Sequence, residues 1–357
     1  MDRLYLAMSC RLGLRLLAVV VLTQPAVAQR GAPAASPVVV QSDGHVTFSV
    51  SAPTAGVVGV FGDFLKTPER LQRDDQGIWS ITLGPLEPDV YNYELAINST
   101  VAARGSFEVR GAKPAFFELR PVPHGAVEQR WYSSKSLRTE RRVFVYTPPN
   151  YSRSSDRYPV LFLLHGGGMN ESLWTESGRA NLILDNLIAD GRMKPLVVVM
   201  PNGYADPAGI EESTDRATNQ RDGFSRDLLE DLIPFVQDNY RVYRDRDHRA
   251  IGGLSMGGGQ ALAIGLGHLD LFSRIAAFSS AVGDVKPLVQ EPQRLNERLA
   301  LLWVACGTED SLFPSNNQFV EFLTSIGVRH TFRATEGTHI WRVWRRYLNE
   351  VAPLLFP

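Results

Sequence analysis

The chain has little cysteine and no long run of charge of one sign. One of its two cysteines, Cys10, lies in the leader described below, which leaves Cys306 without a partner in the mature chain. An intramolecular disulfide is therefore excluded there. Thirty-seven basic and 38 acidic residues give a formal net charge of −1. This balance argues against a nucleic-acid partner or a polyanionic substrate.

Metal-ligand spacing and membrane-spanning runs are also missing. The seven histidines are scattered, so we expect neither a metal site nor a cofactor. The apolar run Leu16–Leu22 is too short to span a membrane. It follows three arginines and precedes small residues ending at Ala28, which is typical of a signal peptide over residues 1–28. We therefore expect a secreted or periplasmic protein.

Residues 37–110 carry short alternating segments separated by turn residues and show no helical period. This pattern predicts a small all-β, immunoglobulin-like sandwich. The expected strands cover residues 45–50, 57–61, 79–83 and 90–95. A linker rich in proline and glycine, residues 111–125, follows them.

Residues 126–357 follow a different pattern, in which apolar strands alternate with helical segments. The expected strands are 143–146, 160–164, 196–200, 250–252, 275–278, 301–305 and 330–334, with helices at 181–189, 227–238 and 258–266. Near-continuous apolar strands are covered on both faces. The sequence therefore predicts an α/β domain with a doubly wound, mostly parallel sheet.

A G-x-S-x-G sequence, Gly253 to Gly257, joins one of these strands to a helix and places Ser255 between glycines. A tight strand-to-helix turn needs glycines there, and it exposes the serine at the carboxyl end of the sheet. This context favours a nucleophile of the α/β-hydrolase type over an incidental serine in a structural turn.

A serine hydroxyl needs a base, which in this fold comes late in the chain. Three histidines follow Ser255. His268 ends the helix after the serine and His330 begins a strand, whereas His339 lies in a loop after the last strand. We therefore predict His339 as the base.

The acid that orients this base should follow an intervening strand. Asp310 and Glu309 both lie just after residues 301–305, and Asp284 follows the strand before them. The shorter carboxylate at the end of the turn suits the task, so Asp310 is favoured and Glu309 stays open as an alternative.

Acyl transfer also needs amide donors for an oxyanion. The residue after the nucleophile, Met256, supplies one, and the loop after an earlier strand supplies the second. His165-Gly166-Gly167-Gly168 occupies that loop. We assign the Gly167 amide, with Gly166 as the nearest alternative and His165 as a loop anchor.

Motifs in this order resemble the esterase D-like hydrolases over about residues 121–356. The segments that carry the resemblance are residues 122–125, 145–149, 164–167, 248–258, 306–310 and 339–345. Within that group the chain is most similar to the bacterial feruloyl and acetyl-xylan esterases of carbohydrate esterase family 1. The resemblance implies hydrolysis of a phenolic or acetyl ester on plant polysaccharide or oligosaccharide.

The sandwich resembles the early-set domains grouped with family 48 carbohydrate-binding modules. Residues 46–48, 52–53, 77–80 and 90–93 carry this likeness, and it implies glycan binding by this domain. Asn98-Ser99-Thr100 replaces the usual Asp-Gly turn, which leaves glycan binding open. Trp79 is favoured as a core residue over a sugar platform.

Three aromatic residues near the expected site, Trp174, Tyr204 and Trp341, are candidates to bind the acyl group. Trp341 equally suits docking of the terminal helix, which is the role favoured for Trp344. The polar stretch 202–222 follows a strand and is expected to form a rim or lid over the cleft.

Other functions remain compatible with this sequence. They are an acetyl-xylan esterase, a siderophore esterase similar to the enterochelin esterases, an acyltransferase similar to the mycolyl transferases, and a glycan-binding protein with an inert hydrolase domain. Fold-level likeness does not choose among them.

Overall fold

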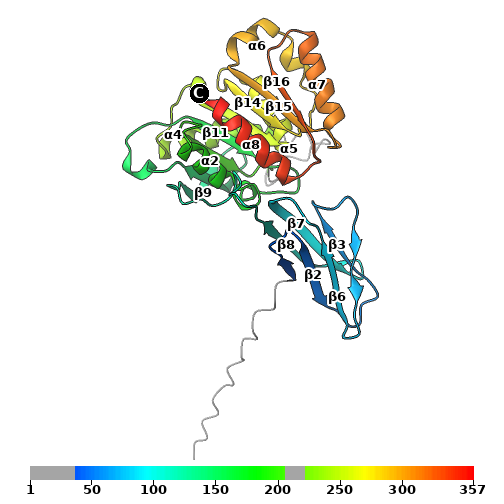
Figure 1. Ribbon diagram of the computed structural model, residues 1–357. Coiled ribbons are helices and arrows are strands. Elements are labelled where there is room, and N and C mark those ends of the chain that lie inside the picture. The colour runs from blue at the N-terminus through cyan, green and yellow to red at the C-terminus, as the bar shows by residue number, and fades with distance from the viewer. Residues whose placement is uncertain (1–36, 206–221) are drawn as a thin grey trace, which may run out of the picture. The chain divides into compact units, whose positions relative to one another are not determined.

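The computed structural model describes residues 37–205 and 222–357 (Figure 1). The expected signal peptide lies outside the described residues, and so does most of the 202–222 stretch. Within the described part of the chain, no helix is both long enough and apolar enough to cross a membrane.

The first part of the chain forms two four-stranded sheets with antiparallel pairing, ordered β1-β2-β6-β5 and β4-β3-β7-β8. These are consistent with the expected sandwich. The strands are β1 Val38–Val40, β2 Val46–Ser51, β3 Val58–Gly62, β4 Glu69–Arg70, β5 Gln72–Arg73, β6 Ile78–Leu83, β7 Asp89–Ile97 and β8 Thr100–Val109. The long strand β8 was not predicted, because its residues 100–106 are mostly exposed and carry little hydrophobic signal.

Apolar side chains from both of these sheets form one core. Phe48 from β2, Tyr93 from β7 and Phe107 from β8 meet there with their rings 5.3–6.2 Å apart. Trp79 belongs to the same core, and its Nε1 donates to the Ala52 carbonyl at 2.9 Å. Its indole is therefore a structural group, as the sequence favours.

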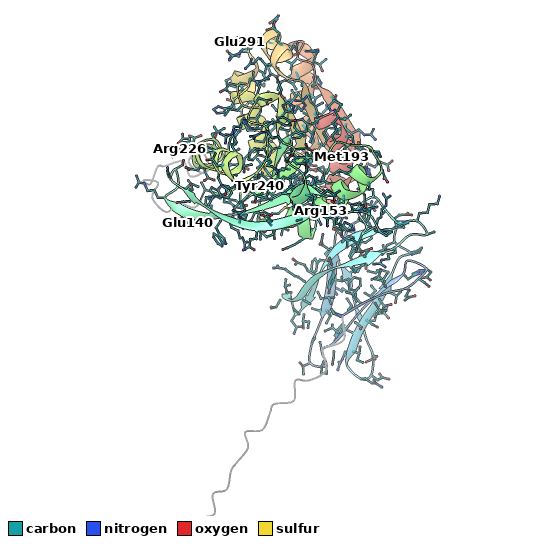
Figure 2. The ribbon with its side chains drawn as sticks, turned by 90° about the vertical axis from the view of Figure 1, so that its left-hand side faces the viewer. Glu140, Arg153, Met193, Arg226, Tyr240 and Glu291 are labelled. Atoms are coloured by element: carbon teal, nitrogen blue, oxygen red, sulfur yellow. The ribbon has the colours of Figure 1, made fainter. Side chains whose placement is uncertain are left out.

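The second part is built on an eight-stranded sheet ordered β16-β15-β14-β13-β11-β12-β10-β9. The strands are β9 Ala126–Ser134, β10 Thr139–Thr147, β11 Val160–Leu164, β12 Val197–Pro201, β13 Arg249–Leu254, β14 Arg274–Phe278, β15 Leu301–Gly307 and β16 Thr331–Thr335. Strands β11 to β16 run parallel, whereas β10 pairs antiparallel with both β9 and β12. The mostly parallel sheet confirms the predicted fold class. Strand β9, at the outer edge, was not predicted (Figure 2, in which Glu140 marks the far end of the β9–β10 hairpin).

Helices cover both faces of this sheet. They are α1 Leu173–Glu176, α2 Ala180–Ala189, η2 Asp227–Leu232, α4 Ile233–Asn239, α5 Met256–Gly267, α6 Pro292–Arg298, α7 Phe313–Ser325 and α8 Trp341–Leu355, with short 3₁₀ turns η1 Tyr151–Arg153, η3 Arg246–His248 and η4 Lys286–Val289. Side chains of η2, α4, α5 and α7 share one core, and those of α2 and α8 share the other. Successive side chains of β11 belong alternately to the two cores. Every position of this strand is therefore buried, which explains its uninterrupted apolar sequence.

Candidate active site

Ser255 stands at the turn between β13 and α5 in a backbone conformation that side chains rarely adopt, with φ 54° and ψ −117°. A Cβ on Gly257 would lie 2.4 Å from the His165 carbonyl oxygen, and one on Gly253 would lie 2.7 Å from the Gly257 backbone. Glycine is therefore required on both sides of the serine. Strain of this kind at a single polar residue is typical of functional sites.

His339 lies between Ser255 and Asp310 and contacts both. Its Nε2 is 3.0 Å from Ser255 Oγ, and its Nδ1 is 2.8 Å from Asp310 Oδ2. An ionised carboxylate only accepts hydrogen bonds, so Nδ1 carries the proton and Nε2 is free to accept one from the serine. The structure thus brings together the three side chains that the sequence selected from three different loops.

Asp310 is buried in the turn after β15, and its environment favours the ionised form. Burial raises its pKa, but hydrogen bonds from His339 and from the Leu312 amide lower it by more, so the net pKa lies below the ordinary carboxyl value. Glu309 and Asp284 are both exposed. The geometry therefore favours Asp310 over both alternatives as the partner of His339.

The loop after β11 is held by His165, which is buried and hydrogen-bonded on both ring nitrogens. The Gly203 amide donates to its Nε2 at 2.9 Å, so Nδ1 carries the proton and donates to the Gly166 carbonyl at 2.8 Å. Burial lowers the pKa of this ring, in keeping with the neutral form that these bonds require. His165 is thus the loop anchor that the sequence suggested, although its bond to Gly203 was not predicted.

This anchor also orients the neighbouring oxyanion candidate. The Gly166 carbonyl and the Gly167 amide belong to one peptide plane, in which N–H and C=O point in opposite directions. Because the carbonyl is turned to His165, the Gly167 N–H is directed away from that ring. Met256 is the first residue of α5, where an amide has no acceptor within its own helix. Both predicted donors are therefore backbone amides whose direction is set locally, by the His165 bond for Gly167 and by the start of α5 for Met256.

The aromatic candidates differ in their surroundings. Trp174 and Trp341 are 1% and 5% exposed, and their rings lie 5.3 Å apart within the core of α2 and α8. Trp174 also donates from Nε1 to the Leu164 carbonyl at 2.9 Å. Both side chains therefore serve as core residues. Tyr204 is half-buried, and its hydroxyl accepts from the Gly168 amide at 2.6 Å, which places this ring beside the oxyanion loop.

One contact at the site was not predicted. The buried Trp344 ring lies 4.9 Å from the His339 ring at an interplanar angle of 87°. The sequence indicated only that Trp344 docks its helix. Its spacing of five residues from His339 was the one available signal, and it is too common to carry a prediction.

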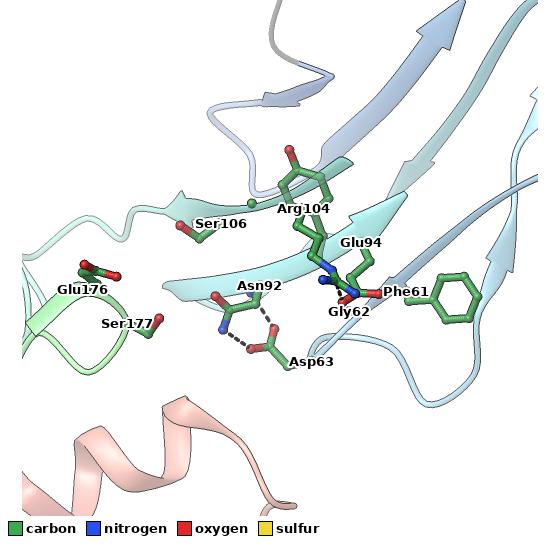
Figure 3. Close-up of a pocket in the computed structure, with 11 residues that line it drawn as sticks. Phe61, Gly62, Asp63, Asn92, Glu94, Arg104, Ser106, Glu176 and Ser177 are labelled. Atoms are coloured by element: carbon green, nitrogen blue, oxygen red, sulfur yellow. Dashed lines mark hydrogen bonds and ion pairs between the residues drawn. The ribbon is translucent and has the colours of Figure 1, made fainter. Parts of the chain in front are cut away.

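A separate cavity of about 620 Å³ lies at the outer face of β3, β7 and β8 (Figure 3). Its lining includes the exposed ring of Phe61, the Glu94–Arg104 ion pair, and Asp63, which is hydrogen-bonded to Asn92. Burial raises the pKa of Asp63. Ser255 and His339 do not line this cavity, so it is distinct from the candidate active site.

Comparison with known proteins agrees with this geometry. The family model described as "Putative esterase" matches residues 134–355. A protein of Xylanibacter ruminicola named endo-1,4-beta-xylanase/feruloyl esterase is 31% identical over 339 residues, covering 89% of this chain and 45% of that protein. The chain therefore spans less than half the length of this curated relative.

Solved structures show the same fold. The ferulic acid esterase of Anaeromyces mucronatus, described as a carbohydrate esterase family 1 enzyme, matches with a TM-score of 0.60 and 25% identity, over 68% of this chain and 96% of that one. The enterobactin esterase of Shigella flexneri matches with a TM-score of 0.64 and 18% identity, over 87% of this chain and 93% of that one. The second likeness concerns the fold alone.

Proposed function

The chain belongs to the esterase family and is a carboxylic-ester hydrolase, and from this premise we propose that it is a secreted feruloyl esterase acting on plant cell-wall polysaccharide. One observation carries the proposed serine mechanism, namely the hydrogen-bonded series Ser255–His339–Asp310 at a strained turn. Similarity to proteins named feruloyl or ferulic acid esterases supports the choice of acyl group. Secretion rests on the leader sequence.

In the first half-reaction Ser255 Oγ attacks the ester carbonyl carbon while His339 Nε2 takes the hydroxyl proton. The carbonyl oxygen becomes an oxyanion, which the Gly167 and Met256 amides stabilise. Collapse of this intermediate breaks the bond to the sugar oxygen, and His339 returns the proton to that oxygen as the alcohol leaves.

In the second half-reaction water replaces the alcohol. His339 removes a proton from water, whose oxygen attacks the acyl-enzyme, and then returns the proton to Ser255 as the carboxylic acid departs. Asp310 stays ionised throughout and stabilises the imidazolium formed in each half, in keeping with its lowered pKa.

The test is a parallel assay of the protein on methyl ferulate, acetylated xylan and a catecholate siderophore, with Ser255→Ala beside it. We expect preferential hydrolysis of methyl ferulate and loss of turnover in the variant. Ser325→Ala, which changes an exposed serine on α7, is the matched control and should behave as the unchanged protein. Full activity of Ser255→Ala would contradict the mechanism.

The same assay separates the alternatives. Preference for acetylated xylan or for the siderophore would replace the feruloyl assignment, and transfer to a sugar acceptor faster than hydrolysis would indicate an acyltransferase. An inert hydrolase domain predicts that Ser255 does not react with a fluorophosphonate probe while xylan binding is retained.

Glycan binding by the sandwich is a separate part of the proposal. Trp79 is buried in the core and is not available to a sugar. The outer face of β3, β7 and β8 is therefore the better candidate surface for glycan binding. Phe61 is 42% exposed there beside paired polar side chains, a combination suited to stacking and hydrogen bonding with a sugar. Phe61→Ala should weaken retention on insoluble xylan without changing kcat on methyl ferulate.

A further inference from the structure

Arg345 of α8 is a fully buried cation that joins three segments of the chain. Its Nη2 donates to Asp89 Oδ1 and, at 2.8 Å, to the Val90 carbonyl at the start of β7. Its Nη1 donates to the Ser177 carbonyl at 2.7 Å, just after α1. The guanidinium also lies 5.1 Å from the centre of the Phe117 ring.

The counter-charge for this arginine comes from the sandwich. Asp89 is 5% exposed, and its Oδ1 accepts from both Arg345 and the Val90 amide. A buried charge is tolerated only when it is paired and hydrogen-bonded. Strand β7 is therefore part of the environment that keeps α8 in place. Ser177, the other residue bonded to Arg345, lines the same cavity as the Asp63–Asn92 pair (Figure 3).

Helix α8 begins directly beside the candidate base. His339 immediately precedes Ile340, the N-cap residue, which makes no side-chain cap, so the position of this first turn depends on what its side chains contact. Trp344 in that turn packs its ring against the His339 ring, and Arg345 is the next residue. A displacement of Arg345 therefore also displaces the Trp344 ring, against which the His339 ring packs.

We propose that the Asp89–Arg345 pair positions His339, so that the sandwich takes part in catalysis without touching the acyl group. Asp89 and Arg345 act as positioning residues through the first turn of α8 and the Trp344 ring. This inference rests on the proposed function, because it takes His339 as the base. Its consequence is that the pair matters even for a small ester that cannot reach the sandwich.

The geometry explains why a small movement is costly. Proton transfer needs His339 Nε2 within hydrogen-bond reach of Ser255 Oγ, and the present distance is 3.0 Å. A misplacement of about 1 Å in catalytic geometry costs on the order of 10²-fold in rate. Substrate binding does not depend on that distance, so kcat should fall while KM stays the same.

The experiment compares Arg345→Met and Asp89→Asn with the unchanged full-length chain on 4-nitrophenyl acetate. We expect kcat, normalised to the folded fraction by near-ultraviolet circular dichroism, to fall on the order of 10²-fold for Arg345→Met and by less for Asp89→Asn. KM should stay within about twofold. A kcat within about twofold of the unchanged protein in a folded Arg345→Met variant overturns the proposal, because a purely structural role would lower only Tm and the folded fraction.

Arg179→Met is the matched control. Arg179, which precedes α2, pairs with Glu108 of β8 at 2.8 Å, so its loss also removes an ion pair to the sandwich but keeps every hydrogen bond of Arg345. It should retain kcat, and an equal fall in both variants would refute a specific role for Arg345. If Arg345→Met does not fold, Arg345→Lys keeps the charge but lacks the planar fork that reaches three acceptors. Its kcat should then be reduced at unchanged KM, and an unchanged kcat would again refute the proposal.

Failure of this inference can be told apart from failure of the proposed function. If Ser255→Ala remains active, the serine mechanism itself is wrong. If Ser255→Ala is inactive while Arg345→Met, Arg345→Lys and Asp89→Asn all keep full kcat, the mechanism stands and only the positioning role is lost.

Discussion

Replacing Asp310 by asparagine tests the buried carboxylate that orients His339. The two side chains have nearly the same size, and an amide oxygen can still accept from the Leu312 amide, now 2.8 Å from Asp310 Oδ1. The fold should therefore survive. The charge that faces His339 Nδ1 at 2.8 Å is lost, and the amide nitrogen favours the wrong imidazole tautomer.

The size of the effect follows from two contributions. An ion pair at about 4 Å between charge centres is worth roughly 4 kcal/mol at an effective dielectric constant near 20, which is about 10³-fold in rate. The wrong tautomer adds to this, and the corresponding substitution in serine proteases costs about 10⁴ in kcat. We therefore expect kcat to fall by about 10³ to 10⁴ with little change in KM.

The assay is steady-state hydrolysis of methyl ferulate, with thermal unfolding measured on the same samples. Glu309→Gln is the control, because it makes the same chemical change at the adjacent, exposed carboxylate. That variant should keep its activity. If Asp310→Asn stayed active while Glu309→Gln lost activity, the acid would be Glu309 and the reasoning from burial and hydrogen bonding would be refuted.

Three further predictions follow from the same site. Gly257→Ala would place a Cβ 2.4 Å from the His165 carbonyl oxygen, so it should destabilise the fold by about 1–3 kcal/mol in urea unfolding and lower kcat; unchanged stability would contradict the tight turn. Tyr204→Phe removes the acceptor of the Gly168 amide, so it should lower kcat/KM about fivefold, the equivalent of one hydrogen bond of about 1 kcal/mol, as measured on methyl ferulate. Because the pKa of Asp310 is lowered in the folded state, its ionisation stabilises the fold above the ordinary carboxyl pKa of about 3.9, and this contribution is lost as the pH falls through the folded-state value. The stability advantage over Asp310→Asn in urea unfolding should therefore be constant near pH 7 and shrink below about pH 4.

Much of the candidate site was predictable because its chemistry is tied to chain order. Ser255 lies between glycines at a strand end, and His339 was selected because the other two downstream histidines lie on regular elements. Parallel strands bring their carboxyl ends to one edge, so loops distant in sequence converge there. The structure places Ser255, His339 and Asp310 within hydrogen-bond distance on this basis.

Edge strands and aromatic roles were less predictable. Strand β9 contributes to the sheet mainly through pairing with β10, and its exposed positions hide the apolar period. Trp174 and Trp341 follow strands or lie near His339, as substrate-binding residues would. Whether such a ring faces the cleft or the core depends on helix packing, which no local pattern encodes.

The sequence by itself determined the succession of a sandwich and an α/β-hydrolase sheet, because strand periodicity and glycine-flanked turns are local properties. It also determined which serine and which histidine were candidates. Only the tertiary structure showed that Asp310, and not the adjacent Glu309, is buried and lies 2.8 Å from His339. It alone revealed that Arg345 meets Asp89, because 256 residues separate them and the pairing exists only once α8 has packed beside β7.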